Sequence, residues 1–159
     1  MSESKAKNQH AKEGLKRNEQ KWTKPLIDAG WTLLPSIILE CQSELDLDPV
    51  DVNIILHLAR HWWYSENPPR PSKRRIADCM KVDQSTIRRH LAKLERRGLI
   101  TRVARFDPIQ GQQSNTYDMS GLIKAALPFA EKAIADIAER QAKKEQAKRK
   151  SPLKVVAMD

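Results

Sequence analysis

Two helix start signals and one helix stop signal, close together in the middle of this 159-residue chain, constrain its fold most strongly. Ser72 can cap a short helix over Lys73–Met80, and after a brief turn Asp83 can cap a second helix over Gln84–Arg97. Gly98 is suited to end the second helix, because glycine readily takes the positive φ found just beyond a helix C-terminus. The sequence therefore predicts two consecutive helices joined by a tight turn.

The neighbouring segments predict a helix before this pair and two strands after it. Asp48 is followed by a proline and an apolar helical pattern, so we expect a helix that runs to about Trp63. Leu99–Arg105 alternates apolar and polar residues like a strand, and Asn115–Met119 can return as its partner. Phe106–Ser114, with a proline, a glycine and three glutamines, is expected to be the loop between the strands.

Towards the N-terminus the expected structure is sparse. Residues 1–21 are nearly all polar and predict a disordered, basic arm. Trp22–Leu34 contains a proline and a glycine and predicts extended chain, with a short strand over Trp31–Leu34. Pro35 suits the first turn of an additional helix that runs through Leu45.

From Ser120 the sequence predicts a long helix to about Lys148, with Pro128 forcing a kink or a restart. Apolar residues recur along it at alternating spacings of four and three, as in a heptad seam: Ile123, Leu127, Ala130, Ile134 and Ile137. The seam predicts either a dimer interface, which we favour, or docking of the helix on its own domain. The chain then divides into the arm (1–21), a domain with an N-terminal extension (22–119), a candidate dimerisation helix (120–150) and a tail (151–159).

The positive charge is concentrated in one segment. Lys and Arg number 29 against 20 Asp and Glu, which gives a formal net charge of +9. Residues 70–106 alone hold twelve basic and three acidic side chains, whereas residues 25–69 hold one basic and seven acidic. A cationic block of this kind indicates a surface that binds a polyanion such as nucleic acid.

The run SKRRIADCMKVDQSTIRRHLAKLERRGLI at residues 72–100 resembles the winged helix-turn-helix of bacterial DNA-binding proteins. These include regulators of the multiple-antibiotic-resistance and GntR types, and replication and control proteins of phages and plasmids. The resemblance covers about residues 48–119. It implies a mainly α (α+β) fold, a winged helix-turn-helix with an extra N-terminal helix, a long C-terminal helix and a small two-stranded wing.

The second helix of the pair carries the side chains suited to read bases. Ile87, Leu91 and Leu94 predict its buried side. In the fold that the sequence resembles, the start of this helix reaches base edges in the major groove, where glutamine can pair with adenine and arginine with guanine. The base-reading candidates are Gln84, Ser85, Thr86, Arg88 and Arg89.

Other polar side chains are better placed to hold the DNA backbone, which fixes register without reading sequence. The phosphate-contact candidates are Ser72, Lys73, Arg74, Arg75 and Lys93. By resemblance, the wing lies on the backbone or enters the minor groove, and its candidates are Arg102, Arg105, Gln112 and Gln113.

The remaining residues that could carry chemistry favour ordinary structural roles. Tryptophans can stack on the bases of a single strand, but we expect all four in the core: Trp22, Trp31, Trp62 and Trp63. His57 and His61 lie one helical turn apart without further ligands at suitable spacing, so no metal site is predicted. Cys79 is expected to be a small core residue.

No sequence signature of a nucleotide-binding loop, a hydrolase or a dinucleotide-binding site is present, so we expect no enzymatic activity and no cofactor. No apolar run is long enough to span a membrane. We expect a cytoplasmic, nucleoid-associated transcription regulator that binds specific double-stranded DNA, as a dimeric repressor. The alternatives are a replication or recombination accessory protein of a phage or plasmid, with a protein partner, and a nonspecific architectural protein.

Overall fold

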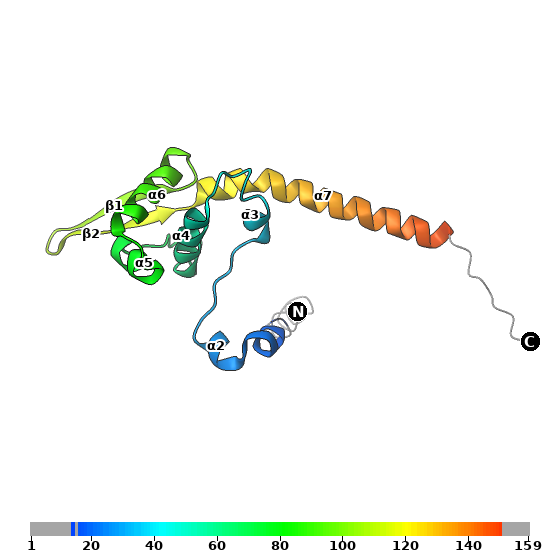
Figure 1. The fold of residues 1–159 in the computed structure, drawn as a ribbon, viewed down its shortest axis with the longest axis horizontal. Helices are drawn as coiled ribbons and strands as arrows, with labels where there is room; N and C mark the ends of the chain where they lie inside the picture. The colour runs from blue at the N-terminus through cyan, green and yellow to red at the C-terminus, as the bar shows by residue number, and fades with distance from the viewer. Residues whose placement is uncertain (1–13, 15, 151–159) are drawn as a thin grey trace, which may run out of the picture.

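The computed structural model describes residue 14 and residues 16–150, so most of the N-terminal arm and the whole 151–159 tail lie outside the described residues. Figure 1 shows the elements in order: α2 (Lys24–Asp28), α3 (Ser36–Glu40), α4 (Pro49–Arg60), α5 (Lys73–Met80), α6 (Gln84–Arg96), β1 (Thr101–Asp107), β2 (Gly111–Asp118) and α7 (Ser120–Lys150). No helix in this part of the chain is long and apolar enough to cross a membrane.

Helices α4, α5 and α6 pack around one hydrophobic core, and the wing base and the start of α7 complete it. The inward residues of α6, Ile87, Leu91 and Leu94, are all fully buried, which confirms the helical periodicity. Fully buried aliphatic side chains from α4 and α5 face them: Ile54, Ile55, Leu58 and Ile76. The predicted pair of helices is therefore present, with the predicted helix before it.

Two of the predicted caps are made as expected. The Ser72 hydroxyl accepts a hydrogen bond from the Arg75 backbone N–H at 3.1 Å, at the start of α5. At the start of α4, the Asp48 side chain accepts from the Val50 and Asp51 backbone N–H groups, and the Asp51 side chain accepts from the Asp48 N–H. This reciprocal capping box fixes where α4 begins.

The caps of α6 differ partly from expectation. Asp83 is the N-cap residue, but its side chain makes no capping bond, and its backbone carbonyl accepts the Thr86 N–H at 2.9 Å. Lys81 takes a left-handed conformation in the turn between α5 and α6. Gly98 follows the end of α6 with a φ of +69°, as predicted, and turns the chain into the wing.

The wing is longer than predicted and its loop is shorter. β1 and β2 pair antiparallel with one bulge, and only residues 108–110 lie between them instead of the predicted 106–114. Asp107 closes the turn by accepting hydrogen bonds from the backbone N–H groups of Ile109 (2.9 Å) and Gln110 (2.8 Å). Gly111 then supplies a φ of +75°. These local contacts extend both strands out to the turn.

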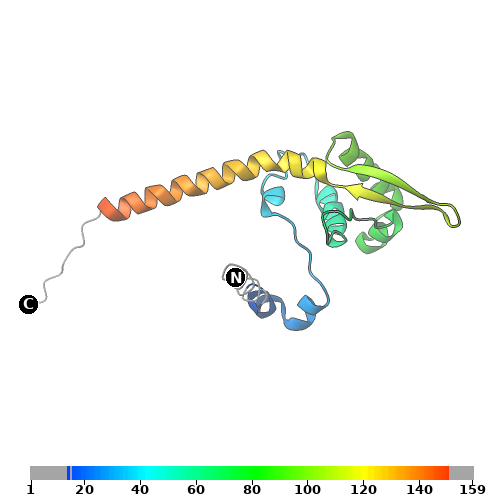
Figure 2. The same cartoon turned by 180° about the vertical axis from the view of Figure 1, so that it is seen from behind.

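Helix α7 runs without interruption through Pro128, so the predicted kink or restart is wrong, and Figures 1 and 2 show a nearly straight helix. Proline removes one helical hydrogen bond, which the Lys124 carbonyl would have accepted. Pro128 and Lys124 are both exposed, so water can satisfy that carbonyl.

A close backbone contact sets the direction in which α7 leaves the domain. A Cβ atom placed on Gly121 would lie only 1.8 Å from the Gly98 carbonyl oxygen. Beside it, the Leu122 N–H donates to the Leu99 carbonyl at 2.8 Å. The first turn of α7 is therefore fixed against the end of α6, the next turns pack on the core through Ala126 and Phe129, and the C-terminal part projects away from the body (Figure 2).

The N-terminal part departs most from expectation. Residues 16–22 are helical where a disordered arm was predicted, and α2 occupies part of the segment predicted as extended. Residues 31–34 form no regular secondary structure, so the predicted strand there is wrong. Helix α3 ends at Glu40 rather than Leu45, because the chain turns over residues 41–46 and so buries both Leu45 and Leu47.

Candidate nucleic-acid interface

The N-terminal half of α6 presents the predicted base-reading side chains to solvent. Gln84, Ser85, Arg88 and Arg89 are exposed and Thr86 is half-buried, while the core residues of the same helix lie on the opposite side. Hydrogen bonding in the turn before α6 and burial of Ile87 fix the rotation of the helix. The exposed side is polar or cationic and carries no large apolar residue.

A polar groove connects the starts of α5 and α6 with the second wing strand. It has a volume of about 380 Å³, and its lining residues are Ser72, Lys73, Arg74, Gln84, Gln112, Gln113, Ser114, Asn115 and Tyr117. Six of these nine were candidates for DNA contact, and they come from three separate elements. No acidic residue lines the groove, so nothing in its wall repels a phosphate.

The wing candidates do not all lie together. Gln112 and Gln113 line the groove, and the Gln112 amide donates to the Arg105 and Gln113 carbonyls, each at 3.2 Å. Arg102 lies at the wing base, where its Nε donates to Glu95 of α6 at 2.7 Å. Arg102 therefore ties β1 to α6, and the hydrogen bond lowers the pKa of Glu95.

Lys93, a predicted phosphate contact, forms ion pairs within the protein. Its ammonium donates to Asp51 at 2.6 Å and to Asp48 at 2.9 Å, which joins α6 to the start of α4. The Asp51 side chain is fully buried, and the Nδ1 atom of His90 lies 2.8 Å from its other oxygen. Since two carboxylates hold the Lys93 ammonium, we leave Lys93 out of the proposed DNA-contact surface.

The contacts in this cluster favour the charged forms of Asp48 and Lys93. Burial raises the pKa of Asp48, but hydrogen bonds from the Asp51 N–H and Lys93, with the charges of His90 and Lys93, outweigh it and lower the pKa to about 2. Hydrogen bonds to Asp51 and Asp48 raise the pKa of Lys93. Among the described residues, Asp48, Asp51 and His90 are grouped as metal ligands would be. The Lys93 ammonium already supplies the positive charge between the two carboxylates.

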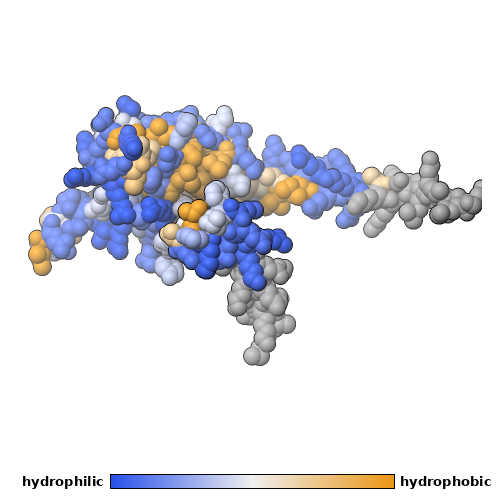
Figure 3. Space-filling model, turned by 60° about the horizontal axis from the view of Figure 1, so that its bottom comes forward, coloured by the Kyte–Doolittle hydropathy of each residue, from blue (hydrophilic) through white to orange (hydrophobic). Residues whose placement is uncertain are grey.

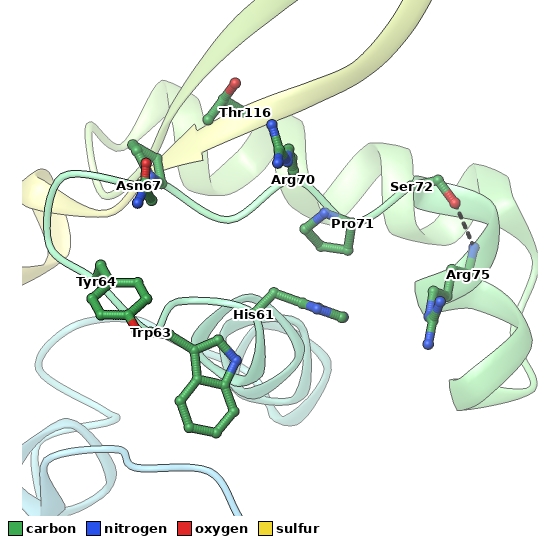
Figure 4. A pocket seen from close by; sticks show the side chains of 10 residues that line it. His61, Trp63, Tyr64, Asn67, Arg70, Pro71, Ser72, Arg75 and Thr116 are labelled. Carbon is green, nitrogen blue, oxygen red and sulfur yellow. Dashed lines mark hydrogen bonds between the residues drawn. The ribbon is translucent and has the colours of Figure 1, made fainter. Parts of the chain in front are cut away.

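Arg75 lies outside the groove and lines a larger pocket on the other side of α5, of about 890 Å³ (Figure 4). The α4–α5 loop forms much of this pocket, with Trp63, Tyr64 and Arg70 in its wall. Sequence reasoning missed this pocket and did not single out Arg70 or Tyr64. The sequence feature that could have indicated the pocket is the Asn-Pro-Pro-Arg-Pro run at residues 67–71, which predicts a rigid loop with an arginine between prolines.

Several residues predicted to be buried are exposed. Trp22, Trp31 and Trp63 are 62%, 48% and 65% exposed, and only Trp62 is half-buried, so the assignment of all four to the core is wrong. Cys79 is also exposed, so the prediction that it is a small core residue is wrong. Trp22 and Trp31 precede the core helices and Trp63 lies in the loop between α4 and α5, where few elements are available to cover them.

Comparison with known proteins agrees with this fold. Residues 45–100 match the model of a family described as a helix-turn-helix domain. Among solved structures, the chain is similar to the N-terminal domain of DnaD protein from Geobacillus kaustophilus, at 16% identity and a TM-score of 0.52, over 75% of this chain and 96% of that one. The search of the curated proteins found no match.

Two further solved structures are similar to the chain. They are the transcriptional regulator PA3341, at 24% identity and a TM-score of 0.40 over 70% of this chain and 81% of that one, and the YusO protein from Bacillus subtilis, at 15% identity and a TM-score of 0.38 over 92% and 98%. The arrangement of α4–α6 with its two-stranded wing, together with the family match, defines the class: this is a winged helix-turn-helix protein. In proteins of this class that bind DNA, the second helix of the motif lies in the major groove.

Proposed function

We propose that the protein is a transcription regulator that binds specific double-stranded DNA, and that it acts in the cytoplasm on the nucleoid as a dimeric repressor. The observation that carries the proposal is the groove at the starts of α5 and α6, which joins six candidate DNA contacts from α5, α6 and the wing without an acidic residue. Recognition of this kind needs binding groups rather than catalytic ones.

The docking geometry follows from which side of α6 is exposed. With α6 in the major groove, Arg88 and Arg89 reach base edges, where arginine pairs bidentately with guanine, and Ser85 is small enough to allow close approach. Lys73, Arg74 and the Ser72 end of α5 then lie against one phosphate backbone. The wing, with Arg105 and its two glutamines, lies against the neighbouring backbone or minor groove.

A second copy of the chain is proposed to bind along α7. One side of the helix packs on the body through Leu122 and Ala126, which are buried. The predicted seam lies elsewhere on the helix and is largely uncovered, with exposed fractions of 48%, 51%, 67% and 52% at Ile123, Leu127, Ile134 and Ile137. Figure 3 shows hydrophobic surface along this projecting helix. Pairing of two such seams would bury these residues and match a two-fold symmetric DNA site.

The dimer is tested by measuring the mass of the protein in solution by sedimentation. We expect a dimer for the natural chain and a monomer for the double variant Ile134→Asp, Ile137→Asp, which places charges in the seam. The matched control is Ala135→Asp with Ala138→Asp, two exposed residues of the same helix outside the seam. A dimer that survives the seam variant would place the interface elsewhere.

Sequence-specific binding is tested by selecting bound duplexes from a random DNA pool at roughly physiological salt, which suppresses nonspecific binding. We expect a palindromic motif whose half-sites are about one helical turn apart. Binding without any enriched motif would contradict the regulator and favour an architectural role. Repression would follow if the motif overlaps a promoter and the purified protein alone lowers transcription from it.

The alternative is an accessory protein for replication or recombination in a phage or plasmid. The observation that favours it is an apolar groove of about 330 Å³ between the extended segment and the end of α4, lined by Trp31, Leu33, Pro35, Ala59, Arg60, Trp62 and Trp63. Such a groove offers a protein partner a place to bind beside the DNA-contact face. An accessory protein would need a companion helicase or primase for its effect, whereas a repressor acts alone in the purified transcription assay.

A further inference from the structure

The pocket behind α5 combines aromatic faces with unpaired cations. Trp63 and Tyr64 are each 65% exposed, and both line it. Arg70 and Arg75 also line it, and neither forms an ion pair with any residue that the structure describes. None of the ten lining residues is acidic. An occupant of this pocket would therefore meet aromatic surface and positive charge together.

The wall of the pocket is held rigid by its own loop. Prolines restrict the backbone at residues 68, 69 and 71, and Pro69 and Pro71 are buried. The Pro69 carbonyl accepts the backbone N–H of Tyr117 at 2.8 Å, which ties the loop to the wing base. Because Arg70 stands between two anchored prolines, little conformational freedom of the backbone is lost when a ligand binds there.

Figure 4 shows how the side chains are distributed. Trp63 and Tyr64 lie together at one end of the pocket, Arg70 lies beside Thr116 near the wing, and Arg75 extends from α5. Burial, then the charges of Arg60 and Arg75, lowers the pKa of His61, so its imidazole is a neutral hydrogen-bonding group between the aromatic and cationic ends. Asn67 adds amide donors and an acceptor.

We propose that this pocket binds a nucleotide unit, with the base stacked on Trp63 or Tyr64 and the phosphate paired with Arg70, while Arg75 adds positive charge from α5. Aromatic side chains stack on any base, and arginine pairs bidentately with phosphate. The unit comes either from a free mononucleotide or from an unpaired stretch of a nucleic-acid strand. The pocket contains no residue of α6 and shares only Ser72 with the groove at the starts of α5 and α6, so this binding is additional to the proposed duplex recognition.

The test measures three affinities of the full-length chain: for adenosine monophosphate by calorimetry, and for a labelled oligo-thymidine strand and the selected duplex by fluorescence anisotropy. Trp63→Leu and Arg70→Gln should each weaken the first two by about tenfold or more, as expected for loss of a stacked base or a phosphate contact. Duplex affinity should stay within about twofold. Trp22→Leu and Arg140→Gln are the matched controls, since both residues are exposed outside the pocket, and thermal melting checks that every variant folds.

The outcomes distinguish a free nucleotide from an unpaired strand as the ligand, and the pocket proposal from the duplex proposal. Binding of the mononucleotide as tightly as the strand identifies a free nucleotide, and much tighter binding of the strand identifies unpaired nucleic acid. If the natural chain binds the duplex but neither probe, or if the pocket variants bind both probes like the natural chain, this proposal is wrong while the duplex proposal stands. An equal loss of duplex binding in the pocket variants would also overturn it, because the pocket would then belong to the duplex interface.

Discussion

Replacing Lys93 with methionine tests whether the buried cluster at Asp51 holds α6 against α4. Methionine keeps an unbranched apolar stem but removes the ammonium. The Asp51 carboxylate is fully buried, and in the variant it would retain only His90 and the Asp48 backbone N–H as partners. An under-compensated charge in the core destabilises the folded state.

The magnitude follows from the exposure of the two partners. Removing one member of a fully buried ion pair costs about 3–5 kcal/mol. The Lys93 side chain is 28% exposed and Asp51 keeps other partners, so we expect a loss of about 2 kcal/mol. For the domain over residues 22–119, that loss corresponds to a fall of about 8–16 °C in the melting temperature.

The assay is urea and thermal unfolding followed by circular dichroism, with Lys124→Met as the matched control. Lys124 is exposed on α7, so its replacement should change stability by less than about 0.5 kcal/mol. Equal stabilities of the two variants would refute the structural role of Lys93. A fall of about one in the salt slope of duplex binding would instead show that Lys93 contacts a phosphate.

Three further predictions concern pH, backbone contact and base recognition. The folded-state pKa of Asp48, about 2, lies below its ordinary value of 3.8, so its contribution is complete above about pH 5 and is lost as pH falls from about 4 to 2. Because the Asp48 side chain is 38% exposed, its contribution to the free energy of unfolding is about 1 kcal/mol. The measurement compares the urea midpoints of the natural chain and Asp48→Asn as the pH falls from about 4 to 2. If the midpoint of the natural chain does not fall relative to that of Asp48→Asn, the prediction is wrong. Gly98→Val should lower the melting temperature, because valine is strained at the φ of +69°. Gly121→Ala should lower it because the added Cβ atom would lie 1.8 Å from the Gly98 carbonyl oxygen. Unchanged melting of either variant would mean that the backbone conformation described at that glycine is wrong. Arg89→Ala should cost about 1–3 kcal/mol at the selected site and relax preference at one base pair, whereas equal losses on all sequences would make Arg89 a phosphate contact.

The sequence was sufficient for the parts of the fold that depend on local signals. The Ser72 cap, the positive φ of Gly98 and the buried residues of α6 are all set by neighbours within one or two helical turns. Four of the nine residues that line the polar groove belong to the cationic segment, but the groove itself was not predicted. Local signals can be recognised in a single sequence because the residues that determine each local structure lie close together along the chain.

The features that the sequence did not reveal depend on distant residues. Lys93 is a solvent-facing cation by helical position, and only packing of α6 against α4 shows its carboxylate partners, which are 42 and 45 residues away. Hydrophobicity alone predicts that Trp63 is buried, yet it lies just after the end of α4 and is 65% exposed. The contact of Gly121 with Gly98 similarly depends on how α7 returns to the domain.

The most direct test of the proposed interface is a nuclear magnetic resonance titration of the amide-labelled protein with the selected duplex. The proposal predicts the largest shifts in three groups of backbone amides, at residues 72–74, 84–89 and 112–113, which the structure brings together on one side. Residues 139–147 of α7, beyond the proposed seam, should remain unchanged. Shifts confined to α7 or to the 63–70 loop, with none at the start of α6, would contradict the account.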